Sequence, residues 1–223
     1  MMHIFINEAH LNILGWNVMG KALKLCTIVF LAVMATAAAQ KIGIWGDRDA
    51  ILQIKNDLEA QAQRVYLDLG NAFMRNAQWE EASASYNAAL TYEPSYAQAM
   101  NNQGVVALKQ QKPASAAAWF ESAIAQDPGE ALYRYNRGIL AFETGDFNTA
   151  SAYFKSVTQI EPQNAHAWFD LGVALGLIAK KFGDRNALLA SRDAFMSVLE
   201  LEPGFPNAKQ NLLITQQILA LDG

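Results

Sequence analysis

Residues 66–94 read YLDLGNAFMRNAQWEEASASYNAALTYEP, and the same order of small, aromatic and proline residues returns further along the chain. The clearest marks are glycines at a constant interval, at Gly70, Gly104, Gly138 and Gly172. In the first three units an alanine, an aromatic residue and a proline follow each glycine at constant distances, and these are Ala82, Tyr86 and Pro94, then Ala116, Phe120 and Pro128, then Ala150, Phe154 and Pro162. A fixed period of about 34 residues indicates a repeat protein, which binds with a surface made by stacking. The sequence therefore predicts a binding groove rather than a catalytic pocket.

Each unit is predicted to form two helices. Apolar residues recur at helical spacing on both sides of a polar break at 76–78 in the first unit, and the third unit has its break at 144–146. Glycine costs about 1 kcal/mol relative to alanine inside a helix, so its return at one phase indicates a packing reason. We expect the second helix to cross the first at the glycine, too close for a side chain. Proline is then expected to end the second helix.

At these positions the chain resembles the tetratricopeptide repeat family, whose helix-turn-helix units carry a Leu-Gly pair followed by aromatic, alanine and proline positions. The first unit matches this pattern throughout, with Tyr66, Leu69, Gly70, Phe73, Ala82, Tyr86, Ala89 and Pro94. The second and third units depart from it at the leucine position, where Gln103 and Arg137 stand. The resemblance implies an all-α fold, an α-solenoid of stacked helix-turn-helix repeats that forms a right-handed superhelix with terminal capping helices.

The spacing divides the chain into an N-terminal part, four repeats and a C-terminal helix. The expected boundaries are 1–39 for an N-terminal extension with a signal peptide, 40–62 for an N-terminal segment with a capping helix, 63–96, 97–130, 131–164 and 165–205 for the repeats, and 206–223 for a C-terminal capping helix. In one interpretation the N-terminal helix is continuous with the first repeat helix. The C-terminal helix is expected to cover the last apolar face and to turn polar residues outward.

The fourth repeat carries seven additional residues, because the interval from Gly172 to Phe195 is longer by seven than the interval from Gly138 to Phe154. They fall within 178–189, which contains a basic stretch around Lys180 and Arg185. Seven residues are nearly two helical turns, so lengthening each helix by about one turn keeps both apolar faces in phase. The favoured interpretation is a longer helix pair with a basic tip. The alternative is a protruding knob that contacts a partner.

Residues 1–39 have the features of a secretory signal peptide. A short basic start follows Met19, an uncharged apolar run spans 25–35, and three alanines at 37–39 precede Gln40 as a cleavage site. The segment before Met19 does not belong to such a signal, so Met19 is an alternative start to Met1. We expect cleavage after Ala39 and export to the periplasm. The alternative is an uncleaved membrane anchor at 22–39, a length that is marginal for a span of about 20 residues.

Composition argues against catalysis and nucleic-acid binding. The formal net charge is −4, and no basic run suits a phosphate backbone. Of the three histidines, His3 and His10 precede the signal and only His166 follows it, while the single cysteine, Cys26, lies inside the signal. A metal site of nitrogen and sulfur ligands, or a nucleophile paired with a histidine, therefore lacks its residues. We expect no catalytic residue, no metal, no cofactor and no enzyme activity.

A candidate binding surface lies on the first helix of each repeat and starts two residues before the glycine. Spacing of i, i+3 and i+7 places three residues on one helix face. This set, here called the stripe, comprises Asp68, Asn71 and Arg75, then Asn102, Val105 and Lys109, then Asn136, Ile139 and Glu143, then Asp170, Val173 and Leu177. The resemblance implies that the stripe lines the concave surface and that Asn102 and Asn136 hold a peptide main chain, for which an amide offers both a donor and an acceptor. Alternatively, these residues hydrogen-bond to the neighbouring repeat or to water.

Two further features bear on the partner. Leu67 and Leu132 stand where some members of the resembled family carry lysines that clamp a C-terminal carboxylate, so a receptor for chaperone tails is not expected. Apolar residues gather near the stripe toward the C-terminal half, and these are Tyr135, Phe142, Phe169 and Leu177. They either receive the apolar face of a partner helix or belong to the core between repeats.

The predicted function is protein–protein interaction, by an exported adaptor that binds a peptide or a helix of an envelope complex in its concave groove. The alternative is a structural subunit of a larger complex, anchored in the membrane by the uncleaved segment or held by self-association. That subunit would use its convex face or residues 178–189 as the working surface. The expected partner is a protein or a peptide in both cases, and not nucleic acid.

Overall fold

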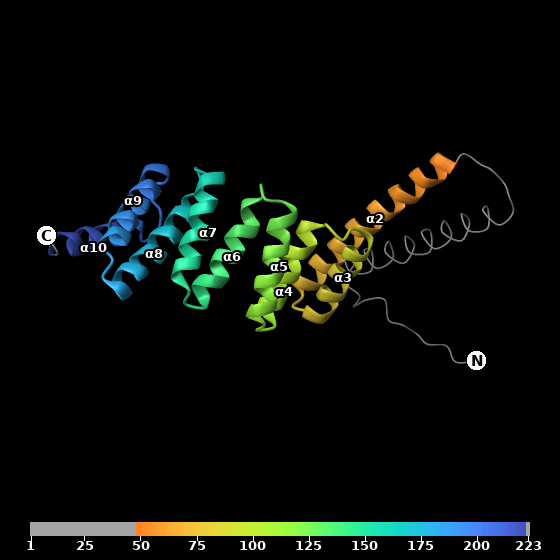
Figure 1. Ribbon diagram of the computed structural model, residues 1–223, viewed down its shortest axis with the longest axis horizontal. Coiled ribbons are helices and arrows are strands. Elements are labelled where there is room, and N and C mark those ends of the chain that lie inside the picture. Colours follow the sequence, from red (N-terminus) through yellow and green to blue (C-terminus); the bar gives the residue numbers. More distant parts are fainter. Residues whose placement is uncertain (1–47, 222–223) are drawn as a thin grey trace, which may run out of the picture. The chain divides into compact units, whose positions relative to one another are not determined.

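The computed structural model describes residues 48–221, and the regular secondary structure of this range is helical (Figure 1). The helices are α2 (Arg48–Arg75), α3 (Trp79–Tyr92), α4 (Ala97–Lys109), α5 (Pro113–Gln126), α6 (Ala131–Glu143), α7 (Phe147–Ile160), α8 (Ala165–Phe182), α9 (Arg185–Leu201) and α10 (Ala208–Leu221). The expected all-α class is confirmed. The predicted signal peptide, the membrane anchor and the alternative start at Met19 lie outside the described residues.

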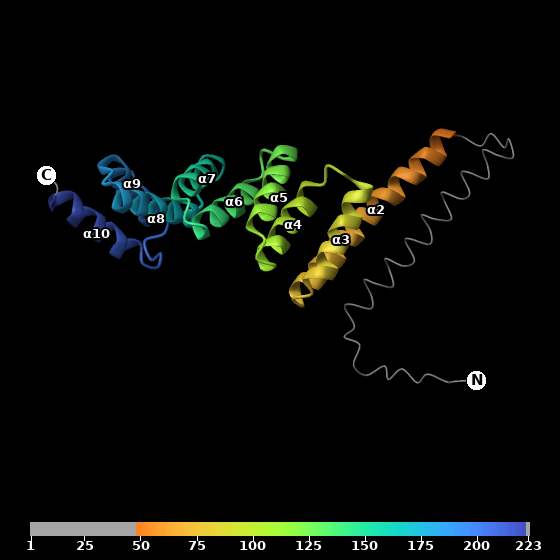
Figure 2. The ribbon, with the colours of Figure 1, turned by 60° about the horizontal axis from the view of Figure 1, so that its bottom comes forward.

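The described residues divide into two compact units, 48–110 and 111–221. Unit 1 contains α2, α3 and α4, and unit 2 contains α5 to α10. Inside each unit, helices that follow one another along the chain pack together (Figures 1 and 2). No helix among those between residues 48 and 221 combines the length and the apolar character that crossing a membrane requires.

The proline of each repeat fixes the end of the second helix. In the first repeat α3 ends at Tyr92, and Glu93 has an extended backbone with φ −135° and ψ 91° before Pro94. The acid that ends α5, α7 and α9 has a similarly non-helical backbone in front of its proline. The pyrrolidine ring disfavours a helical conformation in the residue before it. The acid–proline step therefore sets the length of each second helix, as the sequence predicts.

An aromatic ring of the second helix covers the repeat glycine. In unit 1 the ring of Tyr86 on α3 lies over Gly70 on α2, and a methyl group on that glycine would overlap the ring. In unit 2, a methyl group on Gly138 would lie 2.8 Å from Cε1 of Phe154. A packing reason for the glycines is confirmed, but the expected cause was wrong in one respect. The space is taken by the aromatic side chain that recurs on the second helix, and not by the backbone of that helix.

The fourth repeat contains the seven additional residues inside its two helices. α8 has 18 residues and α9 has 17, whereas α6 and α7 of the preceding repeat have 13 and 14. The aromatic ring still covers the glycine, since a methyl group on Gly172 would lie 2.8 Å from Cε1 of Phe195. The insertion is thus a longer helix pair, joined by a turn at Gly183 and Asp184.

A single residue in the left-handed backbone region makes the turn between the two helices of a repeat. It is Ala77 in the first repeat, with φ 56°, and Gly145 in the third, with φ 78°. Gly183 has φ 67° in the turn of the fourth repeat. Glycine adopts this region without the steric cost that an L residue with a Cβ atom incurs. The turn of the first repeat is therefore less favourable than those of the third and fourth repeats.

In unit 1, one continuous helix joins the N-terminal segment to the first repeat, because α2 runs for 28 residues from Arg48 to Arg75. Its second half packs with α3 and α4 around a core in which Leu67, Tyr86 and Val106 are buried. Partly buried aromatic residues, including Tyr66 and Phe73, surround this core. The first half extends beyond the repeat.

The C-terminal helix α10 packs on α9 but differs from the expected cap. Ala208 and Thr215 are buried, and Leu219 packs against the apolar cluster of α8 and α9. The expected outward-facing polar residues are exposed, and these are Lys209, Gln210, Gln216 and Gln217. Three apolar residues that were not expected at the surface are exposed as well, because Leu213, Ile214 and Ile218 are 54%, 46% and 42% exposed. Apolar residues stand on more than one side of α10, so packing on α9 cannot bury all of them.

Candidate functional site

In unit 1 the stripe reaches solvent at both of its helices. On α2, Asp68 and Arg75 are exposed and Asn71 is half-buried. On α4, the stripe residues show the same gradation, with half-buried Asn102 and Val105 and exposed Lys109. Polar and charged side chains therefore dominate this part of the candidate surface.

Four side chains in unit 1 form a hydrogen-bond network that joins the first repeat to the second. The Tyr86 hydroxyl donates to Asn71 Oδ1 at 2.8 Å, and Asn102 Nδ2 donates to the same oxygen at 2.9 Å. Asn101 Nδ2 donates to Asn102 Oδ1 at 3.2 Å. The alternative expected for the stripe, hydrogen bonding to the neighbouring repeat, thus holds for Asn71 and Asn102.

This network leaves one acceptor position of Asn102 open. A side-chain amide has two N–H donors and an oxygen with two lone pairs. Nδ2 donates to Asn71, the side chain also hydrogen-bonds with Tyr86, and Oδ1 accepts from Asn101, so one lone pair of Oδ1 remains. Burial raises the pKa of Tyr86 to about 12, while a hydrogen bond with the Asn102 side chain and the charge of Arg75 lower it in part. The hydroxyl therefore stays protonated at neutral pH and keeps Asn71 in place as an acceptor.

In unit 2 the stripe acid Asp170 is held by the preceding repeat. The Tyr135 hydroxyl of α6 donates to Asp170 Oδ2 at 2.6 Å. Burial raises the pKa of Asp170, and the hydrogen bond from Tyr135 and the charge of His166 lower it in part. Burial is also the largest cause that raises the pKa of Tyr135, followed by the hydrogen bond to Asp170. Asn136 and Ile139, the stripe residues of α6, are half-buried, and Ile139 packs on a core cluster.

The apolar residues near the stripe divide into two groups. Tyr135 and Phe142 pack against a buried cluster that includes Phe154, and Phe169 packs on Phe195 with ring centroids 5.7 Å apart. These three belong to the core between helices, which was one of the two interpretations. Leu177 instead lines a pocket together with Val173. His166 is exposed and lies edge-on to the ring of Phe205, with ring centroids 4.9 Å apart.

Gln103 and Arg137, the two residues that stand at the leucine position, each bond to the preceding repeat. Gln103 is buried and its amide reaches the second helix of the preceding repeat. Its Nε2 donates to Asn87 Oδ1 at 2.6 Å and to the Ser83 carbonyl oxygen at 2.9 Å, while its Oε1 accepts from Ser83 Oγ at 3.0 Å. Polar residues on both helices thus replace an apolar contact.

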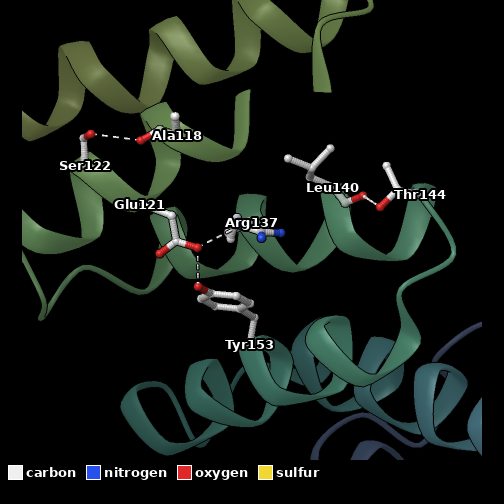
Figure 3. A network of polar contacts seen from close by, with 7 residues as sticks. All are labelled: Ala118, Glu121, Ser122, Arg137, Leu140, Thr144 and Tyr153. Atoms are coloured by element: carbon white, nitrogen blue, oxygen red, sulfur yellow. Dashed lines mark hydrogen bonds and ion pairs between the residues drawn. The ribbon is translucent and has the colours of Figure 1, made fainter. Parts of the chain in front are cut away.

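Arg137 makes the corresponding contact in unit 2, as Figure 3 shows. Its Nε lies 3.0 Å from Glu121 Oε1 on α5, and the Tyr153 hydroxyl donates to the same oxygen at 2.6 Å. The guanidinium carbon stands 5.3 Å from the centre of the Tyr153 ring. Burial raises the pKa of Tyr153 to about 12, with a further rise from Glu121. One carboxylate therefore links α5, α6 and α7.

A pocket of about 570 Å³ opens between α8, α9 and α10. The stripe residues Val173 and Leu177 line it from α8, and Ile214 and Ile218 line it from α10. We call it the C-terminal pocket. The two isoleucines are absent from the predicted site, because the helix that carries them was interpreted as a polar-faced cap. Their spacing of four residues on one face of α10 is the signal that points to a second apolar surface.

Chemistry-bearing groups are sparse around these surfaces. Between residues 48 and 221 there is no group of three or more histidine, cysteine, aspartate or glutamate side chains that could hold a metal ion. The charged residues of the stripe form hydrogen bonds or face solvent. What each unit offers on its stripe helices is a set of polar and apolar side chains suited to contacting another chain.

Comparisons with known proteins agree with the repeat architecture. Residues 67–131 and 135–175 match the family model of the tetratricopeptide repeat. The structure is similar to that of the MamA protein, with a TM-score of 0.61 and 17% identity over 70% of this chain and 81% of that chain. It is also similar to YrrB, a TPR protein with an unusual peptide-binding site, with a TM-score of 0.60 and 23% identity over 76% of this chain and 81% of that chain.

A third similar structure is that of pilF from Pseudomonas aeruginosa. The TM-score is 0.60 and the identity 20%, over 71% of this chain and 69% of that chain. At these identities the likeness is one of fold. No curated protein matches the chain in sequence.

Proposed function

Since this chain is a tetratricopeptide repeat protein, we propose that it is an exported adaptor that holds a peptide or a helix of a protein partner on its stripe. Repeat proteins of this kind act through an extended surface built by stacking. The partner proposed is a component of an envelope complex. This proposal assigns binding to the stripe and no reaction to any residue.

One observation carries the proposal. In unit 2 the stripe residues Val173 and Leu177 open into a pocket whose other wall, Ile214 and Ile218 of α10, is also apolar. Both isoleucines are exposed, at 46% and 42%. Exposed apolar surface that lines a hollow favours protein binding. The amide of Asn102 in unit 1, with one lone pair of Oδ1 to spare, supplies an acceptor suited to a peptide N–H.

Similarity to YrrB supports the class of partner, since YrrB is a TPR protein with an unusual peptide-binding site. At 23% identity the likeness to YrrB is one of fold. The fold provides the surface, and the side chains of this chain decide which partner is held.

Site-specific photocrosslinking in cells tests the stripe. A benzophenone amino acid is placed at Lys109 or Glu143, which are exposed stripe residues, and in matched controls at Ala84 or Lys155, which are exposed on the second helices. We expect one partner protein to be crosslinked from the stripe positions only. Equal crosslinking from all four positions, or none from the stripe, would contradict the proposal.

Export is a separate element of the proposal and has its own test. It is supported by the apolar run at 25–35 and the alanines at 37–39. We expect the chain recovered from the periplasmic fraction to have the mass of a protein that begins at Gln40. Recovery in the membrane fraction with residues 22–39 intact would favour the alternative, a membrane-anchored structural subunit.

A further inference from the structure

The seven-residue insertion of the fourth repeat builds part of the C-terminal pocket. Ala179, Lys180, Gly183, Asp184, Arg185 and Leu188 all lie within 178–189, and all of them line the pocket. They belong to the last turn of α8, the turn that follows and the first turn of α9. In the 13- and 14-residue helices of the preceding repeat this part of the wall has no counterpart. The insertion thus enlarges the surface that α8 and α9 present beside α10.

Three helices each present one face to this pocket. The face of α8 carries Val173, Leu177 and Lys180, and the face of α10 carries Asn211, Ile214 and Ile218. Both sets are spaced i, i+3 or i+4, and i+7, so each runs along one side of its helix. Leu188, Ser191 and Phe195 of α9 lie at the pocket as well, and all three are buried. The hollow is therefore bounded lengthwise by two helices and floored by a third.

The polar side chain that α9 contributes to the floor is already hydrogen-bonded within the protein. Ser191 is 0% exposed, and its hydroxyl donates to the Gly172 carbonyl oxygen at 2.7 Å. Gly172 and Gly176 of α8 also line the hollow, and side chains of α9 cover both of them: the Phe195 ring lies over Gly172, and Ser191 Oγ lies 3.3 Å from the position of a methyl group on Gly176. Apolar side chains of a ligand helix, repeated at i, i+3 and i+4, fit a groove of this kind.

Positive charge surrounds the mouth of the pocket. Lys180 and Arg185 line it, and neither takes part in an ion pair within residues 48–221. Arg185 makes one long hydrogen bond, 3.5 Å from Nη1 to the Leu219 carbonyl oxygen. The acid at the mouth, Asp184, is engaged as the N-cap of α9, where Oδ1 accepts from the backbone N–H of Asn186 and of Ala187. The pocket is thus lined by two cations and one acid, and the net charge of these three residues is positive.

We propose that the C-terminal pocket binds an amphipathic helix of a partner protein, with apolar side chains between α8 and α10 and an acidic side chain against Lys180 and Arg185. This inference rests on the proposed function and names the chemistry of the partner at one end of the stripe. Apolar burial supplies affinity, and the acid sets the direction and register of the helix, since charge complementarity gives specificity more than affinity.

The α10 helix of a second copy does not fit this description. Its exposed apolar residues would suit the hollow, but residues 208–221 contain no aspartate or glutamate, and the one charged residue is Lys209. It would place an additional cation near Lys180 and Arg185. The pocket therefore favours a partner of different sequence, and pairing of two copies is a result that the experiment detects.

A display library of helical peptides of about 16 residues is the probe. It is selected against the purified protein, and the affinities of the enriched peptides are then measured by fluorescence anisotropy. We expect the enriched peptides to share apolar residues at i, i+3 or i+4, and i+7, with an acid beside them. Ile218→Gln and Lys180→Glu are each expected to weaken binding about tenfold or more. Exchanging the acid of the peptide for lysine should restore binding to Lys180→Glu.

Matched controls change residues of the same kind outside the pocket. Leu213→Gln alters an exposed leucine of α10 that does not line the pocket, and Lys155→Glu reverses an exposed charge on α7. Neither is expected to change the affinity of the peptides. Arg185→Glu serves as a second charge reversal, because an acid at the first residue of α9 is favourable for that helix and a loss of binding then does not reflect unfolding.

Three results would overturn the inference. One is enrichment of peptides without acids, and another is equal affinity of the Ile218→Gln and Leu213→Gln proteins. The third is a dimer of the protein that Ile218→Gln dissociates and that the peptides do not disrupt, which would assign the pocket to a second copy. Crosslinking from Lys109 and Glu143 separates this inference from the proposed function, since both positions lie outside the pocket. If they crosslink a partner while the pocket variants bind it normally, the proposed function stands and the inference fails.

Discussion

The ring of Phe195 lies over Gly172, so close that a methyl group on the glycine would stand 2.8 Å from Cε1. The two residues lie seven positions further apart in the fourth repeat than Phe154 and Gly138 do in the third. The contact is nevertheless the same, because the additional residues lie in both helices between the two positions. The glycine and the ring thus define the geometry of the helix pair independently of its length.

Replacing such a glycine is expected to destabilise the fold. Gly138 is the better choice for mutation, since Gly172 lines the C-terminal pocket. Gly138→Ala forces the ring of Phe154 to move, and overpacking of this kind costs about 1–3 kcal/mol. The better helix propensity of alanine returns about 1 kcal/mol, so a net loss is expected in the free energy of unfolding, measured with urea.

The controls for this substitution are two glycines without a close neighbour. Gly204→Ala meets no atom within 4 Å, and Gly129→Ala meets Asp127 Oδ1 at 3.6 Å, an ordinary contact. Both are expected to leave stability nearly unchanged. Combining Gly138→Ala with Phe154→Leu should cost less than the sum of the single changes. An additive double variant would show that the ring does not cause the loss.

The turn residue Ala77 offers a stabilising substitution. Its φ of 56° lies in the left-handed region, where an L residue loses roughly 1–2 kcal/mol. Ala77→Gly removes this cost but increases the conformational entropy of the unfolded chain, so a net gain of about 0.5–1 kcal/mol is expected. Thermal unfolding measures it. Gly145→Ala, at the same turn of the third repeat, should have the opposite effect, and its new methyl group would meet no atom within 4 Å.

How far the sequence predicts this fold depends on which contacts repeat. The glycine, the aromatic residue and the proline recur in each repeat, so their spacing predicts the helices, their ends and the phase of the insertion. The α10 helix occurs once, and there the prediction was incomplete. Leu213, Ile214 and Ile218 are exposed apolar residues of this helix, which a pattern taken from internal repeats does not predict.

The stripe shows a different limit of the sequence. Periodicity predicts that Asn71 shares a face of α2 with Asp68 and that Asn102 lies on the equivalent face of α4. It does not predict that Tyr86 reaches this face and donates to Asn71. Spacing along a helix gives the direction of a side chain, whereas a hydrogen bond depends on the distance between two helices. For the same reason Gln103 and Arg137, which depart from the repeat pattern, give no sign in the sequence of their partners in the preceding repeat.

Asp170 is expected to make stability depend on pH in the acid range. Its folded pKa lies above the ordinary value of 3.8 because of burial, so the folded chain holds the proton to higher pH than the unfolded chain. The contribution to stability is full below the unfolded pKa and is lost as pH rises through the folded pKa. Asp170→Asn keeps an oxygen that accepts from Tyr135 and removes this loss. The variant should gain stability relative to the wild type as pH rises above the ordinary pKa of 3.8, and Asp68→Asn, at the exposed stripe acid, is the control.

Tyr86 is expected to make stability fall in alkali. Its pKa of about 12 in the folded chain exceeds the ordinary value of 10.0, so the unfolded chain ionises first. The stabilisation is complete below pH 10 and is lost as pH rises toward 12. Tyr86→Phe keeps the ring over Gly70, removes this pH dependence and removes the hydrogen bond to Asn71, so it should lower stability at pH 7 by about 0.5–1.5 kcal/mol. An unfolding series between pH 7 and 11 tests both effects, and an alkaline loss of equal size in the variant would assign it to other tyrosines.

The bonds at the leucine position are expected to differ in their response to salt. A double-mutant cycle of Gln103→Ala and Asn87→Ala should give a coupling of about 0.5–1.5 kcal/mol, as for a hydrogen bond between neutral groups. The cycle of Arg137→Ala and Glu121→Ala should give about 0.2–1 kcal/mol, because the Glu121 side chain is 48% exposed. Raising the salt from 0.1 M to 1 M shortens the Debye length from about 10 Å to 3 Å. The Arg137–Glu121 coupling should therefore shrink while the Gln103–Asn87 coupling stays constant, and an equal response of both couplings to salt would show that charge does not distinguish the two contacts.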